Sequence, residues 1–545
     1  MKLPPMPSHS HSWHTLARRV TLASLLAVPG GVLAQSSTPS SGGSCSPDVE
    51  YPVIHNCPAS ITVECVYSGQ DVLWDHADID IKDNCGISSV GYNPEYIGSQ
   101  HSFMSYISAT DLSGHTTYCH TQWNVVDTRP PSVHMMGPSS VVLPEGAAPF
   151  QDPGYWLGED GCDGYLWWSP NKERTGSVNT GVPGTYNIVY SGWDYAGNRG
   201  SVTRQVKVAP FGSSMTPASD APQQRLLHTT TRLNTGRMLV TGGYNTAAQE
   251  FDAQQGTWSS VGSSAATHRG HTATVLLDGR VLVAGGASSA SEEVYNPGSK
   301  SWASASPMST PRFHHGAVQL FNGRVLVAGG GAEEYSGAVL ASAEVYNPAT
   351  NSWAPTGALQ TARRGHTMTL LKTGAVLITG GTDANGTPLS SAEIYNPDSG
   401  GWSTVPSMST GRALHSATLL EGGKVLVVGG TIQAWTQGSS TELFDPATSS
   451  WTTQGSLSSP RQEHTATRLI GDLVLVTGGF NYMTGIQGSS EVYSPLTGTW
   501  RSAAPLSVGR YKHTATAIDD WRVVVVGGAN GTNQAAVDVF KLNAQ

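Results

Sequence analysis

Seven histidines recur at one register, each fourteen residues before a Gly-Gly pair. Histidine is a common metal ligand, so a metal centre is the first chemistry to consider. A repeated register, however, places one histidine in each repeat around a ring, whereas a zinc site needs several side chains that converge on one ion. We therefore expect these side chains to hydrogen-bond backbone between repeats, and we expect no metal site. The histidines are His228, His271, His315, His366, His415, His464 and His513.

Arginines form a second column, three residues before the histidines, with His268 at this position in the second repeat. A ring of guanidinium groups could bind carboxylates or sulfate through paired hydrogen bonds. The alternative is that each arginine pairs with a glutamate column further along its own repeat. The arginines are Arg225, Arg312, Arg363, Arg412, Arg461 and Arg510, and the glutamates are Glu293, Glu344, Glu393, Glu442 and Glu491.

The segments that follow the Gly-Gly pairs differ from repeat to repeat, and variable loops on a rigid scaffold commonly carry binding. Their aromatic residues include Tyr335, Trp435, Phe480 and Tyr482. Aromatic and amide side chains on adjacent loops suit a sugar or a peptide segment. The alternative is that each aromatic side chain packs on its own neighbours. These residues are our candidate contact residues.

Short strands must position these columns, because the repeat period is 43 to 51 residues and suits four strands. In one repeat, residues 272–277 and 280–284 read as strands joined by the two-residue turn Asp278-Gly279. A third strand contains Tyr295 and a fourth contains Trp302. The high glycine content, 63 of 545 residues, also favours turn-rich all-β structure.

The Gly-Gly pairs together with the Glu, Tyr and Trp columns resemble the kelch family. The resemblance implies a seven-bladed β-propeller over residues 210–545. The last repeat lacks the tryptophan of a fourth strand. In intact repeats this tryptophan lies thirteen residues before the next histidine, and the same spacing before His228 reaches Met215. We therefore predict that residues 211–215 form the outer strand that closes the last blade.

Two small modules precede the repeats. Residues 53–128 resemble the hyalin-repeat family, an immunoglobulin-like extracellular β-sandwich, and residues 129–209 resemble bacterial immunoglobulin-like surface modules. All six cysteines lie in the first third of the chain, and six cysteines permit fifteen pairings. With the hyalin-repeat resemblance we expect the disulfides Cys57–Cys119 and Cys65–Cys85, with Cys45–Cys162 as a further pair. Asp160, Asp163 and Asp194 suggest calcium ligands, but turn formation is the favoured interpretation.

The N-terminal residues 1–34 are typical of a signal peptide, and residues 35–52 form a Ser/Gly/Pro linker. No apolar run is long enough for a membrane helix. The net charge of −9 and the absence of a basic run argue against a nucleic-acid partner.

These features predict a secreted or surface-attached binding protein whose propeller recognises an extracellular protein or glycan through one loop face, without a cofactor. The alternative is a carbohydrate-active enzyme, epimerase-like or mutarotase-like, on the same scaffold. Kelch propellers also include copper oxidases with a tyrosine crosslinked to cysteine. Since the propeller region contains no cysteine, we do not expect that chemistry. We assign no catalytic residue.

Overall fold

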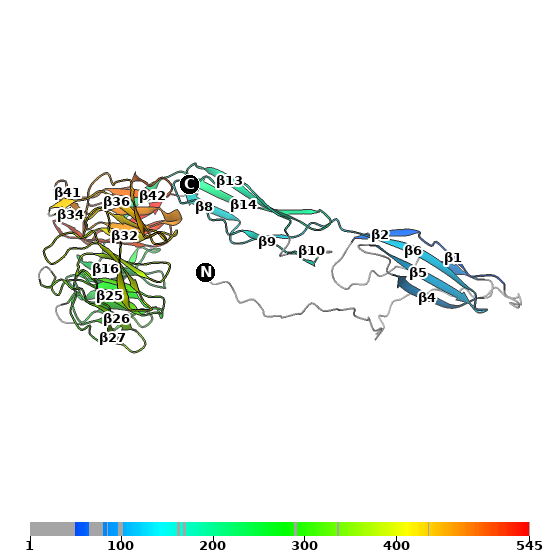
Figure 1. Ribbon diagram of the computed structural model, residues 1–545, viewed down its shortest axis with the longest axis horizontal. Helices are drawn as coiled ribbons and strands as arrows, with labels where there is room; N and C mark the ends of the chain where they lie inside the picture. The colour runs from blue at the N-terminus through cyan, green and yellow to red at the C-terminus, as the bar shows by residue number, and fades with distance from the viewer. Residues whose placement is uncertain are drawn as a thin grey trace. The chain divides into compact units, whose positions relative to one another are not determined.

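The computed structural model describes residues 49–64, 80–83, 86–95, 102–160, 164–166, 170–287, 291–334, 337–433 and 435–543. These residues form an all-β structure with a single short 3-10 helix, Ile470–Asp472 (η2), which confirms the predicted all-β character (Figure 1). The predicted signal peptide lies outside the described residues, as do Cys45, Cys65, Cys85, Cys162, Asp163 and Tyr335.

Two compact units divide the chain. The first comprises the residues up to Pro131 together with Glu159–Leu166 and Trp193–Arg199. The second comprises Ser132–Gly158, Trp167–Gly192 and Gly200–Gln545.

The first module is built on a four-stranded sheet of order β2-β6-β5-β4 and a two-stranded sheet of β1 and β3. Cys57 and Cys119 form a disulfide with a Cα–Cα distance of 5.8 Å, so that predicted pair is present. The inner face of the large sheet buries Ile107, Ala109 and Trp123. The strands are β1 (Val53–His55), β2 (Ser60–Glu64), β3 (Asp80–Lys82), β4 (Ile87–Glu95), β5 (Ser102–Asp111) and β6 (Thr116–Val126).

The second module has a four-stranded sheet of order β12-β13-β14-β8, in which β8 and β14 are parallel. Its core contains Ile188, Tyr190 and Val206. In the turn between β13 and β14, the carboxylate of Asp194 accepts the backbone N–H of Asn198 at 2.8 Å, which is the turn role that the sequence favours over calcium binding. The strands are β7 (Val133–Met135), β8 (Ser140–Pro144), β9 (Tyr155–Leu157), β10 (Glu159–Asp160), β11 (Gly164–Tyr165), β12 (Lys172–Thr175), β13 (Gly184–Trp193) and β14 (Arg199–Ala209).

Each of the seven repeats contributes to a four-stranded antiparallel sheet, and repeat 1 is the one that begins at His228. The sheets of repeats 1 to 4 are β16 (His228–Arg232), β17 (Met238–Gly242), β18 (Ala247–Asp252) and β19 (Thr257–Ser263); β20 (Thr272–Val275), β21 (Val281–Ala284), β22 (Glu293–Asn296) and β23 (Ser301–Ser304); β24 (Gly316–Gln319), β25 (Val325–Ala328), β26 (Ala343–Asn347) and β27 (Ser352–Thr356); and β28 (Thr367–Leu370), β29 (Val376–Thr379), β30 (Ala392–Asn396) and β31 (Gly401–Val405).

Repeats 5 to 7 follow the same plan. Their sheets are β32 (Ser416–Leu419), β33 (Val425–Val428), β36 (Thr441–Asp445) and β37 (Ser450–Gln454); β38 (Thr465–Arg468), β39 (Val474–Thr477), β42 (Ser490–Ser494) and β43 (Thr499–Ala503); and β44 (Thr514–Ala517), β45 (Arg522–Val526) and β48 (Val537–Leu542) with β15 (Ser213–Pro217). Short loop hairpins are formed by β34 (Thr431–Gln433) and β35 (Thr436–Gln437), β40 (Phe480–Asn481) and β41 (Gly485–Ile486), and β46 (Ala529–Asn530) and β47 (Thr532–Asn533).

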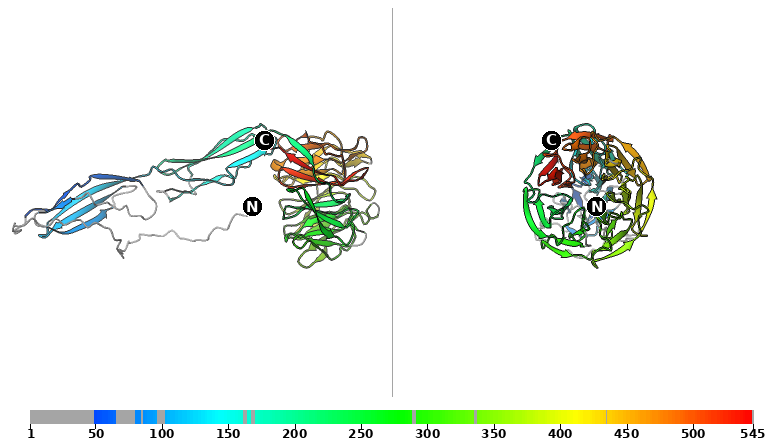
Figure 2. Two further views of the ribbon diagram at one scale, coloured as in Figure 1. Left: turned by 180° about the vertical axis from the view of Figure 1, so that it is seen from behind. Right: turned by 90° about the vertical axis from the view of Figure 1, so that its left-hand side faces the viewer.

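The outer strand of the last sheet comes from the segment that precedes the repeats. β15 pairs antiparallel with β48, and Met215 lies opposite Phe540. The innermost strands of consecutive repeats contact one another, and β16 also contacts β44. Figure 2 (right) shows the sheets arranged around a common centre.

Apolar packing between neighbouring sheets explains this arrangement. The second strand of a repeat is buried on both faces, as the nearly continuous apolar runs predict. Val376 and Ile378 of β29, for example, share a core cluster with Leu326 and Ala328 of β25. The tryptophan column adds a polar tie between sheets, because the indole N–H of Trp353 donates to the carbonyl of Ser306 at 2.8 Å.

Candidate functional site at the loop face

The Gly-Gly pairs mark one end of the sheets, which we call the loop face, and the turns between first and second strands mark the other end, the hairpin face. Glycine is required at the pair. Gly381 has a φ of +94°, and a Cβ there would lie 2.8 Å from the carbonyl oxygen of Arg364. The chain therefore reverses close to the innermost strand of its own repeat.

The histidine column connects neighbouring repeats. The Nε2 of His513, for example, lies 3.0 Å from the hydroxyl of Thr465 in the preceding repeat, and His228 of repeat 1 makes the same contact with Thr514 of repeat 7. Repeat 3 has Gly316 in place of the hydroxyl residue, and the Nε2 of His366 has no hydrogen-bond partner. The histidines connect neighbouring repeats, as we expected. Their hydrogen-bond partners are side-chain hydroxyls, whereas we expected backbone groups.

Burial keeps these imidazoles neutral. It lowers the pKa of His315, His366 and His464 to about 3. Nearby arginines lower it further, Arg312 beside His315 among them. Among the described residues no group of three or more His, Cys, Asp or Glu side chains is placed to hold a metal ion.

Five of the six arginines in the column pair with acidic residues, as in the alternative that the sequence left open, whereas Arg225 reaches the side-chain amide of Gln249. Each of the five arginines named as binding candidates is fully buried, and each forms an ion pair with an acidic residue of its own repeat. The pairs are Arg312–Glu344 at 2.8 Å, Arg363–Glu393 at 2.7 Å, Arg412–Glu442 at 2.7 Å, Arg461–Glu491 at 3.1 Å and Arg510–Asp538 at 2.6 Å.

The arginines also tie the Gly-Gly turns to the sheets. The Nη1 of Arg363 donates to the carbonyl oxygens of Gly380 and Ser391, at 2.8 and 3.0 Å. The carboxylate of Glu393 accepts the backbone N–H of Gln360 at 2.8 Å. These guanidinium groups face protein atoms and present no surface to a ligand.

The residues immediately before the histidines form a second ring. They adopt left-handed backbone conformations, although only Gly270 and Gly365 among them are glycine. From repeat 2 to repeat 7 each donates its N–H to the carbonyl of the equivalent residue in the preceding repeat, as His314 does to Gly270 at 2.9 Å. We call this ring the mouth ring; its members are Leu227, Gly270, His314, Gly365, Leu414, Glu463 and Lys512.

Charged side chains gather on and beside the mouth ring. The Nζ of Lys512 lies 3.4 Å from the carboxylate of Glu463, and Arg269 forms an ion pair with Glu334 at 2.9 Å. Burial raises the pKa of Glu463, and Lys512 partly offsets this effect. Burial lowers the pKa of His314, with Lys512 acting in the same direction. The ring therefore holds ionisable groups away from bulk water.

An aromatic cluster adjoins the mouth ring on repeats 5, 6 and 7. The rings of Trp435 and Tyr482 are 4.8 Å apart, those of Tyr482 and Phe480 are 5.0 Å apart, and those of Phe480 and Tyr511 are 5.5 Å apart. Trp435 is 72% exposed and Tyr482 is 45% exposed. Lys512 of the mouth ring lies over Tyr511, 5.8 Å from its centroid. We call Trp435, Phe480, Tyr482 and Tyr511 the aromatic cluster.

Buried amides hold the loops beneath the aromatic cluster. The backbone N–H of Tyr482 donates to the side chain of Gln437 at 3.0 Å, and Gln437 donates to Gln462 at 3.2 Å. Asn481 donates to the carbonyl of Pro460 at 2.8 Å and accepts the N–H of Met483 at 2.7 Å. The aromatic side chains are thus presented on loops that are fixed by hydrogen bonds.

The structure therefore sorts the candidate residues into two groups. Trp435, Phe480 and Tyr482 come together, whereas the five arginines lie inside the sheets. Sequence reasoning missed Tyr511 and the charged members of the mouth ring. The available signal was the position before each histidine, which varies while the histidine itself does not.

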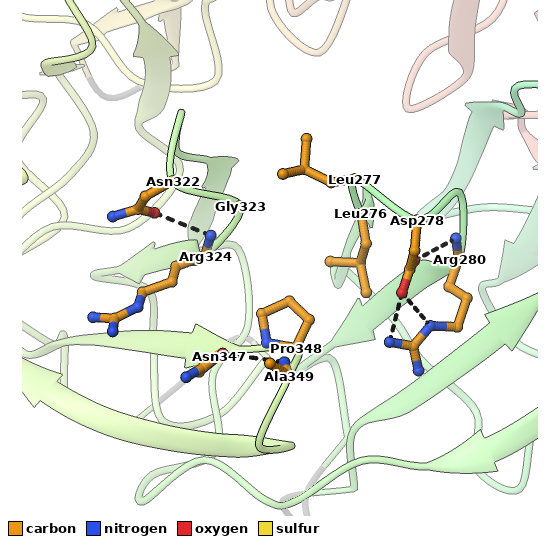
Figure 3. Close-up of a pocket in the computed structure, with 10 residues that line it drawn as sticks. All are labelled: Leu276, Leu277, Asp278, Arg280, Asn322, Gly323, Arg324, Asn347, Pro348 and Ala349. Atoms are coloured by element: carbon orange, nitrogen blue, oxygen red, sulfur yellow. Dashed lines mark hydrogen bonds and ion pairs between the residues drawn. The ribbon is translucent and has the colours of Figure 1, made fainter.

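A pocket of about 430 Å³ lies on the hairpin face, between repeats 2 and 3 (Figure 3). It lies on other repeats than the aromatic cluster and on the opposite face. Its Asp278 and Arg280 are paired with each other at 2.7 Å, so they offer no acid/base pair. Among the described residues no helix has the length and apolar character needed to cross a bilayer.

Comparison with known families supports two of the three assignments. Residues 314–528 match the family described as the KLHDC2/KLHL20/DRC7 Kelch-repeats domain. Residues 133–208 match the family described as bacterial surface protein, Ig-like domain. The chain thus contains a kelch-repeat domain and a bacterial surface Ig-like domain, while the hyalin-repeat resemblance of residues 53–128 stays a prediction.

Solved structures resemble the chain at low sequence identity. One is described as a "novel fungal alcohol oxidase with catalytic diversity among the AA5 family, in complex with copper"; it has 19% identity and a TM-score of 0.52, and the match covers 62% of this chain and 77% of that one. Another, described as "Structure of YjhT", has 16% identity, a TM-score of 0.42 and coverage of 52% and 98%. At such identities the likeness to the oxidase shows the fold alone. No curated protein matches the chain.

Proposed function

We propose that this chain is a secreted or surface-attached binding protein that recognises an extracellular protein or glycan through the loop face of repeats 5 to 7. Kelch domains mediate protein binding, and the surface Ig-like domain and the Cys57–Cys119 disulfide point to an extracellular location. The observation that carries the proposal is the aromatic cluster, in which three repeats bring Trp435, Tyr482 and Tyr511 beside a charged mouth ring.

The chemistry of the aromatic cluster suits recognition. Exposed rings supply contact area at low entropic cost, and the loops beneath them are already ordered by buried amides. Lys512 and Glu463 at the mouth ring provide a polar group for orientation. A protein or glycan that covers Trp435 and Tyr482 would bury apolar surface without a large rearrangement.

The architecture that we propose for this function is a closed seven-bladed propeller over residues 210–545. It follows a signal peptide (1–34), a linker (35–52), a hyalin-repeat module (53–128) and an Ig-like module (129–209). Support for closure comes from the β15–β48 pairing and from the contact between β16 and β44. Deletion of residues 209–218 should lower the melting temperature strongly, and an unchanged melting temperature would reject closure by this strand.

The binding proposal is tested with the full chain on a glycan array and in pull-downs from extracellular fractions. Trp435→Ala and Tyr482→Ala should weaken capture of any ligand by about tenfold or more, as expected for central aromatic contacts. Phe321→Ala is the matched control, because Phe321 is 67% exposed but lies on the hairpin face. Equal binding by all three variants would reject the proposed binding site on the loop face.

A carbohydrate-active enzyme is the second candidate, and one observation favours it. Burial raises the pKa of Glu463, which lies on the same mouth ring as His314, and a buried carboxyl with a raised pKa is the type of group that serves as a general acid. Turnover of a sugar by the wild type, and its loss in Glu463→Gln with folding retained, would favour this activity. Turnover that survives in Glu463→Gln would exclude Glu463 as the acid.

A further inference from the structure

The first module has an open sheet face that the propeller proposal does not use. Along β6, Cys119, Thr121 and Trp123 are buried, whereas Tyr118 and His120 on the alternate positions are exposed. Because successive side chains of a strand point to opposite faces, the exposed residues lie on the face away from the core. We call this surface the outer sheet face.

Three rings meet on the outer sheet face. Tyr118 and His120 are stacked with centroids 6.2 Å apart and an interplanar angle of 29°. Tyr106 of β5 lies opposite His120 in the antiparallel register, and its ring is 5.9 Å from His120 and 5.7 Å from Tyr118. Tyr118 is 54% exposed. The rings thus form one continuous aromatic platform across two strands.

Small and hydroxyl-bearing residues border the platform. Ser108 lies opposite Tyr118, and Gly91 of β4 lies opposite Ser108. A Cβ on Gly91 would lie 2.6 Å from the Ser108 hydroxyl. Glycine at this position therefore leaves the surface beside Ser108 without a side chain. Thr110 and Gln122 extend the same register with hydroxyl and amide groups. At the position of Gly91, a ligand on the rings therefore meets no side chain.

The outer sheet face carries almost no charge. In the register of β4, β5 and β6, the neighbours of the three rings are Gly91, Asn93, Met104, Ser108, Thr110 and Gln122, and the acidic residues of these strands, Glu95 and Asp111, are terminal. The described strands β2, β4, β5 and β6 contain no Lys or Arg, the side chains that bind phosphate or sulfate most strongly. Among the described side chains beside the rings, Met104 is apolar and the others are polar or small, which differs from the core of a protein interface.

We propose that the outer sheet face of the first module binds a neutral polysaccharide. The apolar C–H faces of pyranose rings stack on aromatic rings, and their hydroxyl groups exchange hydrogen bonds with imidazole, amide and hydroxyl side chains. An extended chain of neutral sugars suits this surface, in which the rings of Tyr118 and His120 are stacked and Tyr106 meets Tyr118 edge-on, at 71°. This site is separate from the loop face and would place the propeller on a glycan surface.

The test is affinity electrophoresis of the full chain in native gels that contain laminarin, galactomannan, hydroxyethyl cellulose or dextran. We expect at least one of these polysaccharides to retard the wild type. Tyr118→Ala/His120→Ala should weaken that retardation by about tenfold or more. Tyr118→Phe should retain it, because the ring is kept. Retardation should be unchanged by 0.5 M NaCl, since a neutral ligand has no charge to screen.

Two variants locate the binding. Tyr195→Ala removes a 75% exposed tyrosine in the turn between β13 and β14, which is not part of the outer sheet face, and serves as the matched control. Trp435→Ala/Tyr482→Ala removes part of the aromatic cluster of the loop face. Retardation that survives in both controls and falls in Tyr118→Ala/His120→Ala supports the proposal. No retardation by any polysaccharide, or loss only in the loop-face variant, overturns it; the second outcome would support the propeller site instead.

Discussion

The inner ends of the repeats are nearly the same from one sheet to the next, whereas the loops above them differ in length, charge and aromatic content. Arg363 is fully buried and bound to Glu393, while Trp435 is 72% exposed on a loop of the following repeat. The repeated residues form hydrogen bonds and ion pairs with one another inside the sheets. The variable residues face solvent and are available for a ligand. The repeated residues therefore belong to the scaffold, and the residues that differ between repeats belong to the candidate site.

Acidification should have the largest effect, because it acts on all seven buried histidines together. Their pKa values are below the ordinary value of 6.5, at about 3 for His228 and His513, so the unfolded chain binds more protons as the pH falls below about 6.5. Each histidine should then lower the unfolding free energy by about 1.4 kcal/mol per pH unit. Urea unfolding at pH 7.5, 6 and 5 measures the slope, and a midpoint that does not change between these values contradicts it.

Removal of one buried carboxylate should have the next largest effect. Glu393→Ala leaves the charge of Arg363 buried and unpaired, which should cost about 3–5 kcal/mol in urea unfolding. Repeat 1 supplies the matched control, because Arg225 there reaches the neutral amide of Gln249, at 3.3 Å, in place of a carboxylate. Gln249→Ala should therefore cost less, about 1 kcal/mol. Equal losses would show that the ion pair is not what distinguishes repeat 4.

Loss of one contact between repeats should be smaller. Thr465→Val keeps the side-chain volume but removes the hydroxyl that faces the Nε2 of His513, which should cost about 1–2 kcal/mol. Thr467→Val, two residues along the same strand, is the control, because the hydroxyl of Thr467 is buried without a hydrogen-bond partner. That substitution should be neutral or stabilising. The same loss in both variants would mean that the hydroxyl–imidazole contact contributes nothing of its own.

Changes in the aromatic cluster should affect stability least. Trp435 is largely exposed and its ring contacts only Tyr482 among the described rings, so Trp435→Ala should change the unfolding free energy by less than about 1 kcal/mol. Ligand capture should fall in the same variant. A large loss of stability would instead make Trp435 part of the scaffold and remove the contrast between the two regions.

The sequence predicts the repeats well because their periodicity is a local property. Spacing alone predicts the strands around the Gly-Gly pairs and the position of Met215 in the outer strand of the last sheet. Burial is not visible in this way. An arginine column three residues before a histidine suits either a ligand or a glutamate, and only the folded repeat shows that Arg363 lies within 2.7 Å of Glu393.

The mouth ring escaped sequence reasoning for a different reason. Its left-handed conformation is expected at glycine, but His314, Glu463 and Lys512 adopt it as well. Tyr511 was missed because it precedes an inner strand and does not lie in a loop after a Gly-Gly pair. By contrast, Trp435, Phe480 and Tyr482 were found because they interrupt otherwise similar loops, and their mutual contact depends on the spatial order of the repeats.

The mouth ring also has a consequence for how such a scaffold acquires new specificity. Its backbone is fixed by hydrogen bonds between peptide groups, which do not depend on side-chain identity, and it already holds Leu, Gly, His, Glu and Lys. The side chains at the seven positions can therefore be exchanged while the backbone that carries them keeps its conformation. A combinatorial library restricted to these positions could change ligand preference while leaving the packed sheets untouched.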